Sequence, residues 1–591
     1  MCGITGIISK KQIDKNIIKP MTDVIVHRGP DGDGFYFGDN FAFGHRRLAI
    51  VDLSQAGHQP MEYLDRYVIT YNGEIYNFID LKDILIKAGY SFKNHTDTEV
   101  VMASYDYWGV DCLNRFNGMW AFVIYDKVKD EYFISRDRFG VKPLYYYIDD
   151  EKFIFASEIK SILQYPDINI KPNNKFLQDY LNDGCKEFIK TTAFTNVFRF
   201  DVASYFKGSI DELLSNFKQN RFWKLKPNFA YEKFDKSKAS KYAEKYYNLL
   251  KDAVRIRLNA DVKVGSALSG GLDSSSIVYL INQILKEENK QELQETFSSV
   301  YHSEGTQDCD ESKFIKSVAD HLGVNSNTIE PKVSDIPNEH QKMIYHLENP
   351  PENTLMSSWH TFKLIASTEV KVTLDGQGAD EQLAGYTPYV MTYLSSLGML
   401  ELLKESLFCC KRIKNKKSII RGFLIGLFKN LFGQKIIKFL INKYMHKNIC
   451  FNLNSSIYKD FESSLVTLLH YADHTSMAHS IESRMPFMDY RLVEFLASIP
   501  SCYKMHMGWT KYIARLAFDK RLPDDVVWRV DKMGWPIPEK HWFEVELKDW
   551  MKSIIMASKY IDKIYNSKIK LTLSKQLRML NISVFEKCFF K

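Results

Sequence analysis

The sequence predicts an α+β first half followed by an α/β second half built on a doubly wound parallel sheet. Residues 1 to about 205 contain aromatic and β-branched runs that are typical of strands, such as "MWAFVIYD" and "EYFISRD". From about residue 238, long helical patterns alternate with short apolar runs such as "VKVGSAL" and "VKVTLDG". This alternation indicates parallel strands with helices on both faces of the sheet.

The first half combines strands with amphipathic helices. Two of its segments, "FIDLKDILIKAG" and "TDTEVVMASYDYWG", place apolar residues at helical spacing. We therefore expect sheets covered by helices. A polar, lysine-containing stretch, "WKLKPNFAYEKFDKSKAS", separates this pattern from the second half and predicts domains at 2–205 and 238–591, joined by a linker at 206–237.

Length and composition limit the class of protein. The chain has 591 residues, which is too long for one ordinary domain, and its 45% hydrophobic and 26% charged residues are typical of a globular protein. Its net charge of +7 is concentrated, because the segment from Lys411 to Cys450 contains eleven Lys or Arg and no Asp or Glu. The near-neutral remainder argues against nucleic acid as a partner.

The nine cysteines show no CxxC pair and no zinc-ligand spacing, so they indicate neither a disulfide framework nor a metal knuckle. This usage is typical of a reducing compartment. The chain does not open with a charged segment followed by an apolar one, and it has no uncharged apolar run of about eighteen residues. We expect a cytoplasmic protein that does not span a membrane.

A glycine-rich loop follows the first apolar strand of the second half, in "VKVGSALSGGLDSSSIVYLI". Glycines let the backbone approach an anion, and successive N–H groups, serine hydroxyls and the helix N-terminus can all bind phosphate oxygens. The P-loop lysine is absent, but Asp273 offers a carboxylate that could hold Mg²⁺ on the phosphates. The alternative is an ordinary turn with a helix cap.

A second acidic loop follows another apolar strand. That strand ends at Leu374, and a glycine-rich turn runs from Asp375 to Glu381. Because the carboxyl ends of parallel strands meet at one edge of a sheet, Asp380 and Asp273 could share one magnesium ion.

The chain begins "MCGITG", which places a cysteine directly after the initiator methionine. Removal of the methionine would leave Cys2 with both a thiol and a free α-amine, whose reference pKa values of about 8.5 and about 7.7–8.0 make proton transfer between them nearly balanced. On its own, the hexamer is equally consistent with a small buried cysteine at the start of a strand.

These motifs together resemble a known family. The loop "SGGLDSS" resembles the pyrophosphate loop of the N-type ATP pyrophosphatases. With "MCGITG", "HRGPDGDG", "HRRLAIVD", "YNGEIYN" and "HTDTEV", nearly the whole chain outside about 395–450 resembles the glutamine-hydrolysing asparagine synthetases. The resemblance implies an N-terminal-nucleophile glutaminase with an αββα sandwich, followed by an ATP pyrophosphatase synthetase domain, and a tunnel for ammonia between them.

The resemblance also implies roles for individual residues. In the first half, Cys2 would be the nucleophile, and Asn72 with the Gly73 N–H would form the oxyanion hole. The glutamine-binding residues would be Arg47, Asn72, Gly73, Glu74 and Asp97, with Arg47 on the α-carboxylate and Asp97 on the α-amine.

In the second half, ATP would be bound as a substrate with Mg²⁺ held by Asp273 and Asp380. Lys532 would be catalytic by stabilising charge on the α-phosphate. The ATP and pyrophosphate site would comprise Leu268, Ser269, Gly270, Gly271, Asp273, Ser274, Ser275, Val300, Asp375 and Gly376. The acceptor site would comprise Gln377, Asp380, Glu381 and Arg484.

Two features depart from the family pattern. Gln377 stands where the family usually has glutamate, and glutamine cannot take a proton. The second departure is the basic insert at about 395–450, where Ile420, Phe423, Leu424, Leu427, Phe428 and Leu431 follow helical spacing. This insert predicts either a weak membrane-surface contact through residues 411–450 or a helix packed on its own domain.

The leading hypothesis is an enzyme that uses glutamine, ATP and aspartate to make asparagine. A second hypothesis keeps the mechanism but changes the acceptor, for instance to a sugar uronic acid in surface-polysaccharide assembly. A third is a scaffold that keeps the fold without catalysis. Whether the chain forms a homodimer, and whether free ammonia can replace glutamine, stays open at this point.

Overall fold

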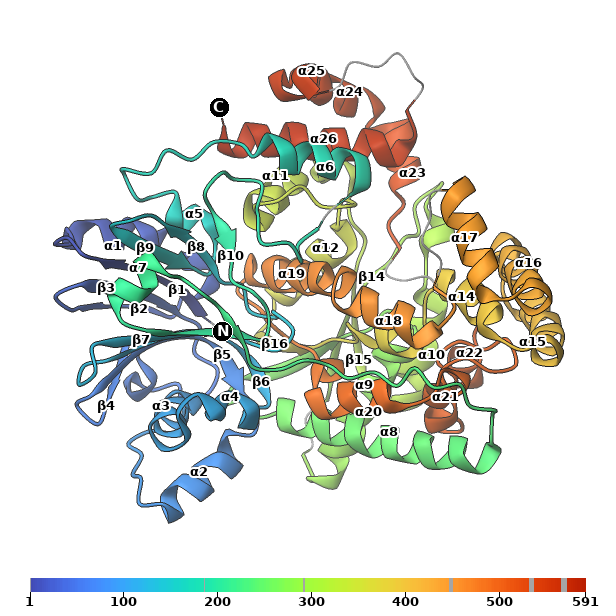
Figure 1. The fold of residues 1–591 in the computed structure, drawn as a ribbon, viewed down its shortest axis with the longest axis horizontal. Coiled ribbons are helices and arrows are strands. Elements are labelled where there is room, and N and C mark those ends of the chain that lie inside the picture. The colour runs from blue at the N-terminus through green and yellow to red at the C-terminus, as the bar shows by residue number, and fades with distance from the viewer. Residues whose placement is uncertain are drawn as a thin grey trace.

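The computed structural model describes residues 2–184, 186–290, 293–445, 450–530, 536–564 and 571–590. Figure 1 shows the sheets of the first half, in blue to green, at one end of the molecule and the second half beside them. The sheets of the first half end at Arg221, and a long helix, α8 (Lys236–Arg257), opens the second half. The exact domain limits remain a prediction.

Two antiparallel sheets of six strands form the first half. In spatial order the first sheet consists of β10 (Phe198–Arg199), β8 (Tyr145–Ile148), β9 (Lys152–Ala156), β1 (Cys2–Ser9), β3 (Phe41–Arg47) and β2 (Gly32–Phe37). The second sheet consists of β12 (Asn220–Arg221), β11 (Ser204–Gly208), β7 (Glu131–Arg136), β6 (Gly118–Asp126), β5 (Tyr67–Ile75) and β4 (Met61–Tyr63).

Alternation along the strands explains why these sheets stack. Ile4 and Ile8 of β1 share a core with Val68 and Val123 of the second sheet. Ile7, which points to the opposite face, packs in the core that contains α1 (Lys15–Asp23). On the outer face of the second sheet lie α2 (Phe78–Lys87) and α3 (Asp97–Trp108). Each sheet therefore has one face on the other sheet and one on helices, which confirms the predicted αββα sandwich.

Five parallel strands form the sheet of the second half. In spatial order they are β15 (Asn325–Ile329), β14 (Glu295–Ser299), β13 (Lys263–Ala267), β16 (Val370–Leu374) and β17 (Glu482–Arg484). From β13 the chain first adds β14 and β15 on one side, and it then returns to add β16 and β17 on the other side of β13. Such a reversal opens a crevice at the carboxyl ends of the two central strands, and it confirms the doubly wound sheet.

Helices cover both faces of this sheet. Val372 and Leu374 of β16 pack in the core that contains α8 and α9 (Leu272–Glu287). Val370 instead packs with Phe362 and Ile365 of α12 (Met356–Ile365).

The structure differs from the sequence expectations in two strands. The run "FAFGHRRLAIVD" predicts one strand to residue 52, but β3 ends at Arg47. Strand pairing stops there because the Arg47 guanidinium donates hydrogen bonds to the carbonyls of Asp52 and Ser54, which curls the following segment into a loop. The polar strand β17 has three residues and no apolar pattern, so its sequence gives no strand signal.

The basic insert is helical. It comprises α15 (Met399–Arg412), α16 (Lys416–Phe432) and α17 (Gln434–Met445), which pack beside α14 (Pro388–Ser396). In Figure 1 these helices form the end of the molecule opposite the sheets of the first half. Within the described ranges, no helix is long and apolar enough to cross a membrane.

Candidate active sites

Cys2 lies at the point where the two sheets of the first half meet. Its backbone nitrogen donates a hydrogen bond to Asn72 Oδ1 of β5 at 3.1 Å, and its carbonyl accepts one from Arg28 Nε at 3.3 Å. Burial raises the pKa of the Cys2 thiol, against the lowering effects of the Leu48 backbone and the Arg47 charge. Cys2 is therefore half-buried, with its backbone nitrogen bonded to the Asn72 amide of the neighbouring sheet.

Arg47 is the direct cross-strand neighbour of Cys2. Its guanidinium donates to the Ser54 carbonyl at 2.6 Å and to the Asp52 carbonyl. A side chain at Gly57 would lie 2.3 Å from Arg47 Nη2, so the loop needs glycine there. These contacts fix the direction of the guanidinium beside the thiol.

Two buried carboxylates lie on the far side of Asn72. Asp97, the first residue of α3, accepts hydrogen bonds from Tyr71 Oη at 2.7 Å and from the Ile75 backbone at 2.8 Å, and burial raises its pKa to about 6. Burial raises the pKa of Glu74 well above its ordinary value, and the nearby Asp97 charge adds to this effect. The structure thus brings together all the residues that the sequence selects for glutamine.

Gly73 lies between Asn72 and Glu74 on β5. A Cβ at this position would lie 2.3 Å from the Met119 carbonyl of β6. The close approach of the two strands explains why glycine is needed here.

The second site forms where β13 and β16 end side by side. After β13, Gly270 has a φ of +69°, and its missing Cβ leaves room for Phe314. Ser274 Oγ accepts a hydrogen bond from the Ser269 backbone at 3.2 Å, which holds the loop at the start of α9. A Cβ at Gly376 would lie 3.0 Å from the Ser274 nitrogen, so the two loops touch.

Asp273 and Asp380 come from these two loops and meet at one lysine. Lys511 Nζ lies 2.5 Å from Asp273 Oδ2 and also contacts Asp380 Oδ1. Lys511 is 2% exposed, so this is a buried cation between two carboxylates. The predicted pair of metal ligands therefore converges on a single positively charged group.

A cavity of about 250 Å³ opens beside this lysine. Of the residues that the sequence selects for ATP and the acceptor, those that line it are Leu268, Ser269, Asp273, Ser274, Asp375, Gly376, Gln377, Asp380 and Glu381. The opposite wall comes from α19 (Ser464–Met477), through Leu468, Tyr471, Ala472 and Thr475.

Burial perturbs two of the lining carboxyl groups. It raises the pKa of Asp375 to about 6 and that of Glu381 to about 7, where the Asp380 charge adds to the effect. Tyr386 Oη donates to Glu381 Oε1, whereas Glu381 Oε2 has no hydrogen-bond partner among the described residues.

Other selected residues lie elsewhere. Gly270, Gly271 and Ser275 belong to the loop and the first turn of α9 without lining the cavity, and Val300 follows β14. Arg484 is fully buried on β17. Its Nε donates a hydrogen bond to Glu482 Oε1 at 2.5 Å, and its Nη2 lies 3.7 Å from Glu74 Oε2 of the first half. Lys532 lies outside the described residues.

Comparisons with known proteins agree with this arrangement. Residues 1–223 match a model described as a glutamine amidotransferase domain, and residues 245–579 match one described as asparagine synthase. The chain is 31% identical to asparagine synthetase (glutamine-hydrolyzing) 1 of Bacillus subtilis, over 96% of this chain and 92% of that protein. It is 37% identical to putative asparagine synthetase (glutamine-hydrolyzing) 2 of Methanocaldococcus jannaschii, over 72% and 82%.

The chain belongs to the glutamine-hydrolysing asparagine synthetase family. In this family member, α19 lies between the two candidate sites. One face of α19 lines the cavity, while Asp473 on the same helix pairs with Arg28 Nη2 at 2.6 Å and with Lys142 Nζ at 3.2 Å. Since Arg28 also contacts the Cys2 carbonyl, one helix connects both sites.

Charges at this junction compensate one another. Arg28 Nη1 also pairs with Glu158 Oε1 at 2.8 Å, and the side chains of Arg28, Glu158 and Asp473 are all buried. Although burial opposes the charged form, Arg28 and Lys142 hold the pKa of Asp473 below its ordinary value. A buried ion is tolerated only when such partners surround it.

A group of potential metal ligands occurs at the same junction. In the part of the chain that the structure describes, His27, Glu158 and His346 place ligand atoms within 4.8 Å of one another. Glu158, however, already pairs with Arg28 and Lys160. Two buried cations beside the carboxylate oppose the binding of a metal ion, so this cluster belongs to the junction.

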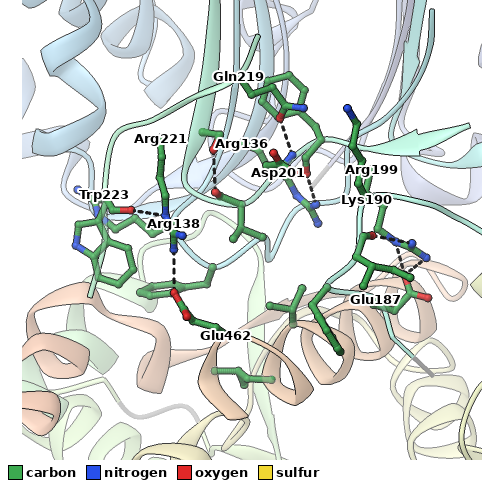
Figure 2. Close-up of a pocket in the computed structure, with 18 of the residues that line it drawn as sticks. Arg136, Arg138, Glu187, Lys190, Arg199, Asp201, Gln219, Arg221, Trp223 and Glu462 are labelled. Carbon is green, nitrogen blue, oxygen red and sulfur yellow. Dashed lines mark hydrogen bonds and ion pairs between the residues drawn. The ribbon is translucent and has the colours of Figure 1, made fainter. Parts of the chain in front are cut away.

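Another cavity, of about 360 Å³, lies between the two halves and is rich in arginine (Figure 2). Its arginines are engaged by protein groups. Arg136 donates to the carbonyls of Gly140, Lys142 and Phe200, and Arg199 Nε donates to Glu187 at 2.7 Å. This cavity contains none of the residues selected for chemistry; Arg136 and Arg199 bond within the first half, and Arg221 pairs with Glu462 of the second half at 3.3 Å.

Sequence reasoning missed Lys511, Glu482 and Asp473. Lys511 lies in "GWTKYIARLAF" and Glu482 in "HSIESRMPFMD", but their charge alone is also typical of surface residues. A signal for Asp473 was that it is the one acidic residue of its helix, in which no Lys or Arg can pair with it.

We predict that Asp473→Asn lowers the free energy of unfolding by about 3–5 kcal/mol, because it leaves two buried cations without their shared counter-charge. The control is Asp179→Asn on α6 (Asn174–Asp183), which breaks an exposed pair with Lys175 and should change stability by less than about 1 kcal/mol. Thermal unfolding measures both variants. Equal shifts would contradict the role given to the buried network.

Proposed function

We propose that this chain synthesises asparagine with glutamine as nitrogen donor and ATP as energy source. Glutamine is hydrolysed at Cys2, the side-chain carboxylate of aspartate is activated as its adenylate, and ammonia converts the adenylate to the amide. The observation that carries this proposal is the convergence of Asp273 and Asp380 at the sheet crevice, in a cavity that α19 connects to the Cys2 site.

The first half-reaction uses Cys2 as nucleophile. Once Met1 is removed, the Cys2 nitrogen becomes an α-amine that can take the thiol proton. The sulfur then attacks the glutamine side-chain carbonyl carbon, the C–N bond breaks, and the nitrogen leaves as ammonia with that proton. Water hydrolyses the thioester, which releases glutamate and restores the thiol.

Asn72 and Gly73 would stabilise the oxyanion formed during this attack. The Asn72 side-chain oxygen accepts from the Cys2 nitrogen and its Nδ2 donates one hydrogen to Ser157 Oγ at 3.5 Å, so its second N–H could donate to the oxyanion. One such donor can lower the barrier by roughly 3 kcal/mol. Arg47 would pair with the α-carboxylate of glutamine, and Asp97 with Glu74 would bind its α-ammonium group.

The second half-reaction takes place at the cavity beside Lys511. Backbone N–H groups and hydroxyls of Ser269–Ser275 would bind the pyrophosphate end of ATP. Asp273 and Asp380 fit Mg²⁺ because both offer carboxylate oxygens at one cavity and Mg²⁺ prefers oxygen ligands; the Lys511 ammonium would turn to a phosphate oxygen when the ion binds. Mg²⁺ would neutralise phosphate charge. The carboxylate of the acceptor attacks the α-phosphorus, and pyrophosphate leaves; we assign Lys532 to the charge on that phosphate.

Amide formation requires a group that accepts a proton. Ammonia attacks the carbonyl carbon of the adenylate, the C–O bond to AMP breaks, and the new nitrogen must lose one proton. Gln377 cannot take it. We assign this step to Glu381, because its Oε2 faces no partner among the described side chains and the residue lines the same cavity.

A second acceptor class is favoured by one observation. With Gln377 in the acidic turn, the acceptor wall has one carboxylate fewer to pair with the α-ammonium group of an amino acid, and a sugar uronic acid has no such group. The mechanism would be unchanged.

The test of the proposed function is acceptor-dependent pyrophosphate release. Purified enzyme is incubated with glutamine, ATP and Mg²⁺, together with aspartate, a uronic acid or neither. We expect release with aspartate, accompanied by asparagine in equal amount. Release with the uronic acid but not with aspartate would transfer the proposal to the second acceptor class. If neither acceptor increased pyrophosphate release, both proposals would be contradicted.

Replacing the nucleophile should separate the two half-reactions. We expect Cys2→Ala to abolish glutamine use, because no thioester can form, while ammonium salts still support amide synthesis. Glutamate production and amide production are measured in parallel. Glutaminase activity in this variant would contradict the assignment of Cys2.

Glu381→Gln tests the proton-accepting step. We expect amide formation to fall by about 10²–10⁴-fold, while exchange of labelled pyrophosphate into ATP, which reports adenylate formation, is retained. The matched control is Glu369→Gln, an exposed carboxylate outside the cavity. Parallel loss of exchange and amide formation in Glu381→Gln would indicate a structural role instead.

A further inference from the structure

We propose that the helical insert α15–α17 is a docking surface for anionic lipid bilayers. The claim goes beyond the proposed reaction and concerns where the enzyme works. It depends on exposed apolar side chains and exposed cations that occur on the same three helices.

The first helix of the insert carries an apolar stripe that faces solvent. Leu400, Leu403 and Leu407 are spaced by three and four residues, and they are 83%, 46% and 69% exposed. Residues at this spacing lie on one side of a helix. The opposite side of α15 is buried through Leu402 and Cys409, so this exposure is not the result of a loosely packed helix.

The second helix, α16, is apolar on two sides. Ile419, Phe423 and Leu427 pack into the core of the insert with α14. Ile420, Leu424, Phe428 and Leu431 form a separate stripe that is 43% to 60% exposed. Of the six residues in the predicted stripe, Phe423 and Leu427 pack on the protein's own domain, whereas the other four face outward.

The third helix, α17, repeats this pattern with basic residues among the apolar ones. Ile436, Phe439 and Tyr444 are 54%, 63% and 70% exposed. Lys443 Nζ lies 5.8 Å from the Phe439 ring centre and 5.4 Å from that of Tyr444. Aromatic rings beside lysines suit the boundary between lipid headgroups and acyl chains.

Between α14, α16, α17 and α18 (Leu453–Phe461) lies a broad groove of about 1800 Å³. Apolar side chains from α16 and α17 line it, among them Leu424, Phe428, Ile436 and Leu440. The exposed apolar stripes of α16 and α17 thus continue into this recess, whose other side, next to α18, carries polar groups such as Asp460 and Glu462. An exposed apolar surface with a polar rim indicates an interaction site.

Charge decides which occupant fits. From Met399 to Met445 the chain contains eleven Lys or Arg against two acidic residues, Glu401 and Glu405, while Asp460 and Glu462 lie on the far side of the groove. Two copies of such a surface would repel each other, and the apolar stripes do not suit nucleic acid. A bilayer with anionic headgroups satisfies both features, since phosphates attract the lysines and the acyl region accepts the leucines and phenylalanines.

The position of the insert allows the enzyme to work while docked. Figure 1 places α15–α17 at the end of the molecule opposite the sheets of the first half. None of the residues that line the cavity beside Lys511 belongs to α15, α16 or α17. Docking would therefore leave both candidate active sites open to small molecules.

Vesicle co-sedimentation of the full-length chain tests the proposal. We expect the wild type to bind vesicles that contain one-third phosphatidylglycerol in phosphatidylcholine, to bind pure phosphatidylcholine at least about tenfold more weakly, and to be released by salt. Lys435→Gln with Lys438→Gln should lower the partition coefficient by about 25-fold, since each lysine near an anionic surface contributes about a fivefold factor.

A second pair of variants tests the apolar stripes. Leu431→Gln with Phe439→Gln should lower binding by about tenfold or more, because both side chains would lose their contact with the acyl region. Matched controls are Lys87→Gln with Lys129→Gln for charge, and Ile79→Gln with Ile86→Gln for exposed apolar residues on α2. These controls should bind as the wild type does.

Three results would overturn the proposal. They are no sedimentation of the wild type with anionic vesicles, equal binding to anionic and neutral vesicles, and equal losses in the insert variants and the controls. The first result would assign the surface to a protein partner. Far-UV circular dichroism with thermal unfolding verifies that each variant is folded, so that lost binding reports the surface.

Discussion

The buried ion pairs around Arg28 and Asp473 are the constraint on which the two-site arrangement depends. Arg28 touches the Cys2 carbonyl, Glu158 and Asp473, and none of the three charged side chains reaches solvent. Because a buried charge without a partner costs several kcal/mol, the two halves cannot slide or separate without a large penalty. The network therefore fixes α19 relative to the thiol, and α19 in turn forms a wall of the second cavity.

The second site follows from the sheet order. β13 and β16 are parallel neighbours at which the order of strand addition reverses, so the loops after these two strands must meet at one crevice. Each loop brings one carboxylate, and Lys511 lies between them with its charge shared by Asp273 and Asp380. The two carboxylates offer oxygen ligands for a metal ion bound to phosphates, and binding of that ion would turn the Lys511 ammonium toward a phosphate oxygen.

Much of the fold and of the two candidate sites could be predicted from local sequence patterns. The patterns of the first half predicted sheets covered by helices, and the family resemblance supplied the αββα sandwich. The strand-loop-helix pattern placed Ser269–Ser275 and Asp375–Glu381 at one sheet edge. The sequence could not place Arg484, because β17 is three polar residues whose position depends on pairing with β16. That pairing turns Glu482 and Arg484 toward Glu74 of the first half, away from the acceptor cavity. Helical spacing likewise predicted α16 but could not divide its apolar residues between a buried and an exposed side, since that depends on where α14 packs.

The central claim is that ammonia released at Cys2 reaches the adenylate within one chain. The most direct measurement is isotope competition: the enzyme is given glutamine labelled at its amide nitrogen in the presence of excess unlabelled ammonium, and the label in the product amide is read by mass spectrometry. The account predicts a labelled fraction far above that of the ammonia in solution. A product whose label equals that of the bulk ammonia would contradict it.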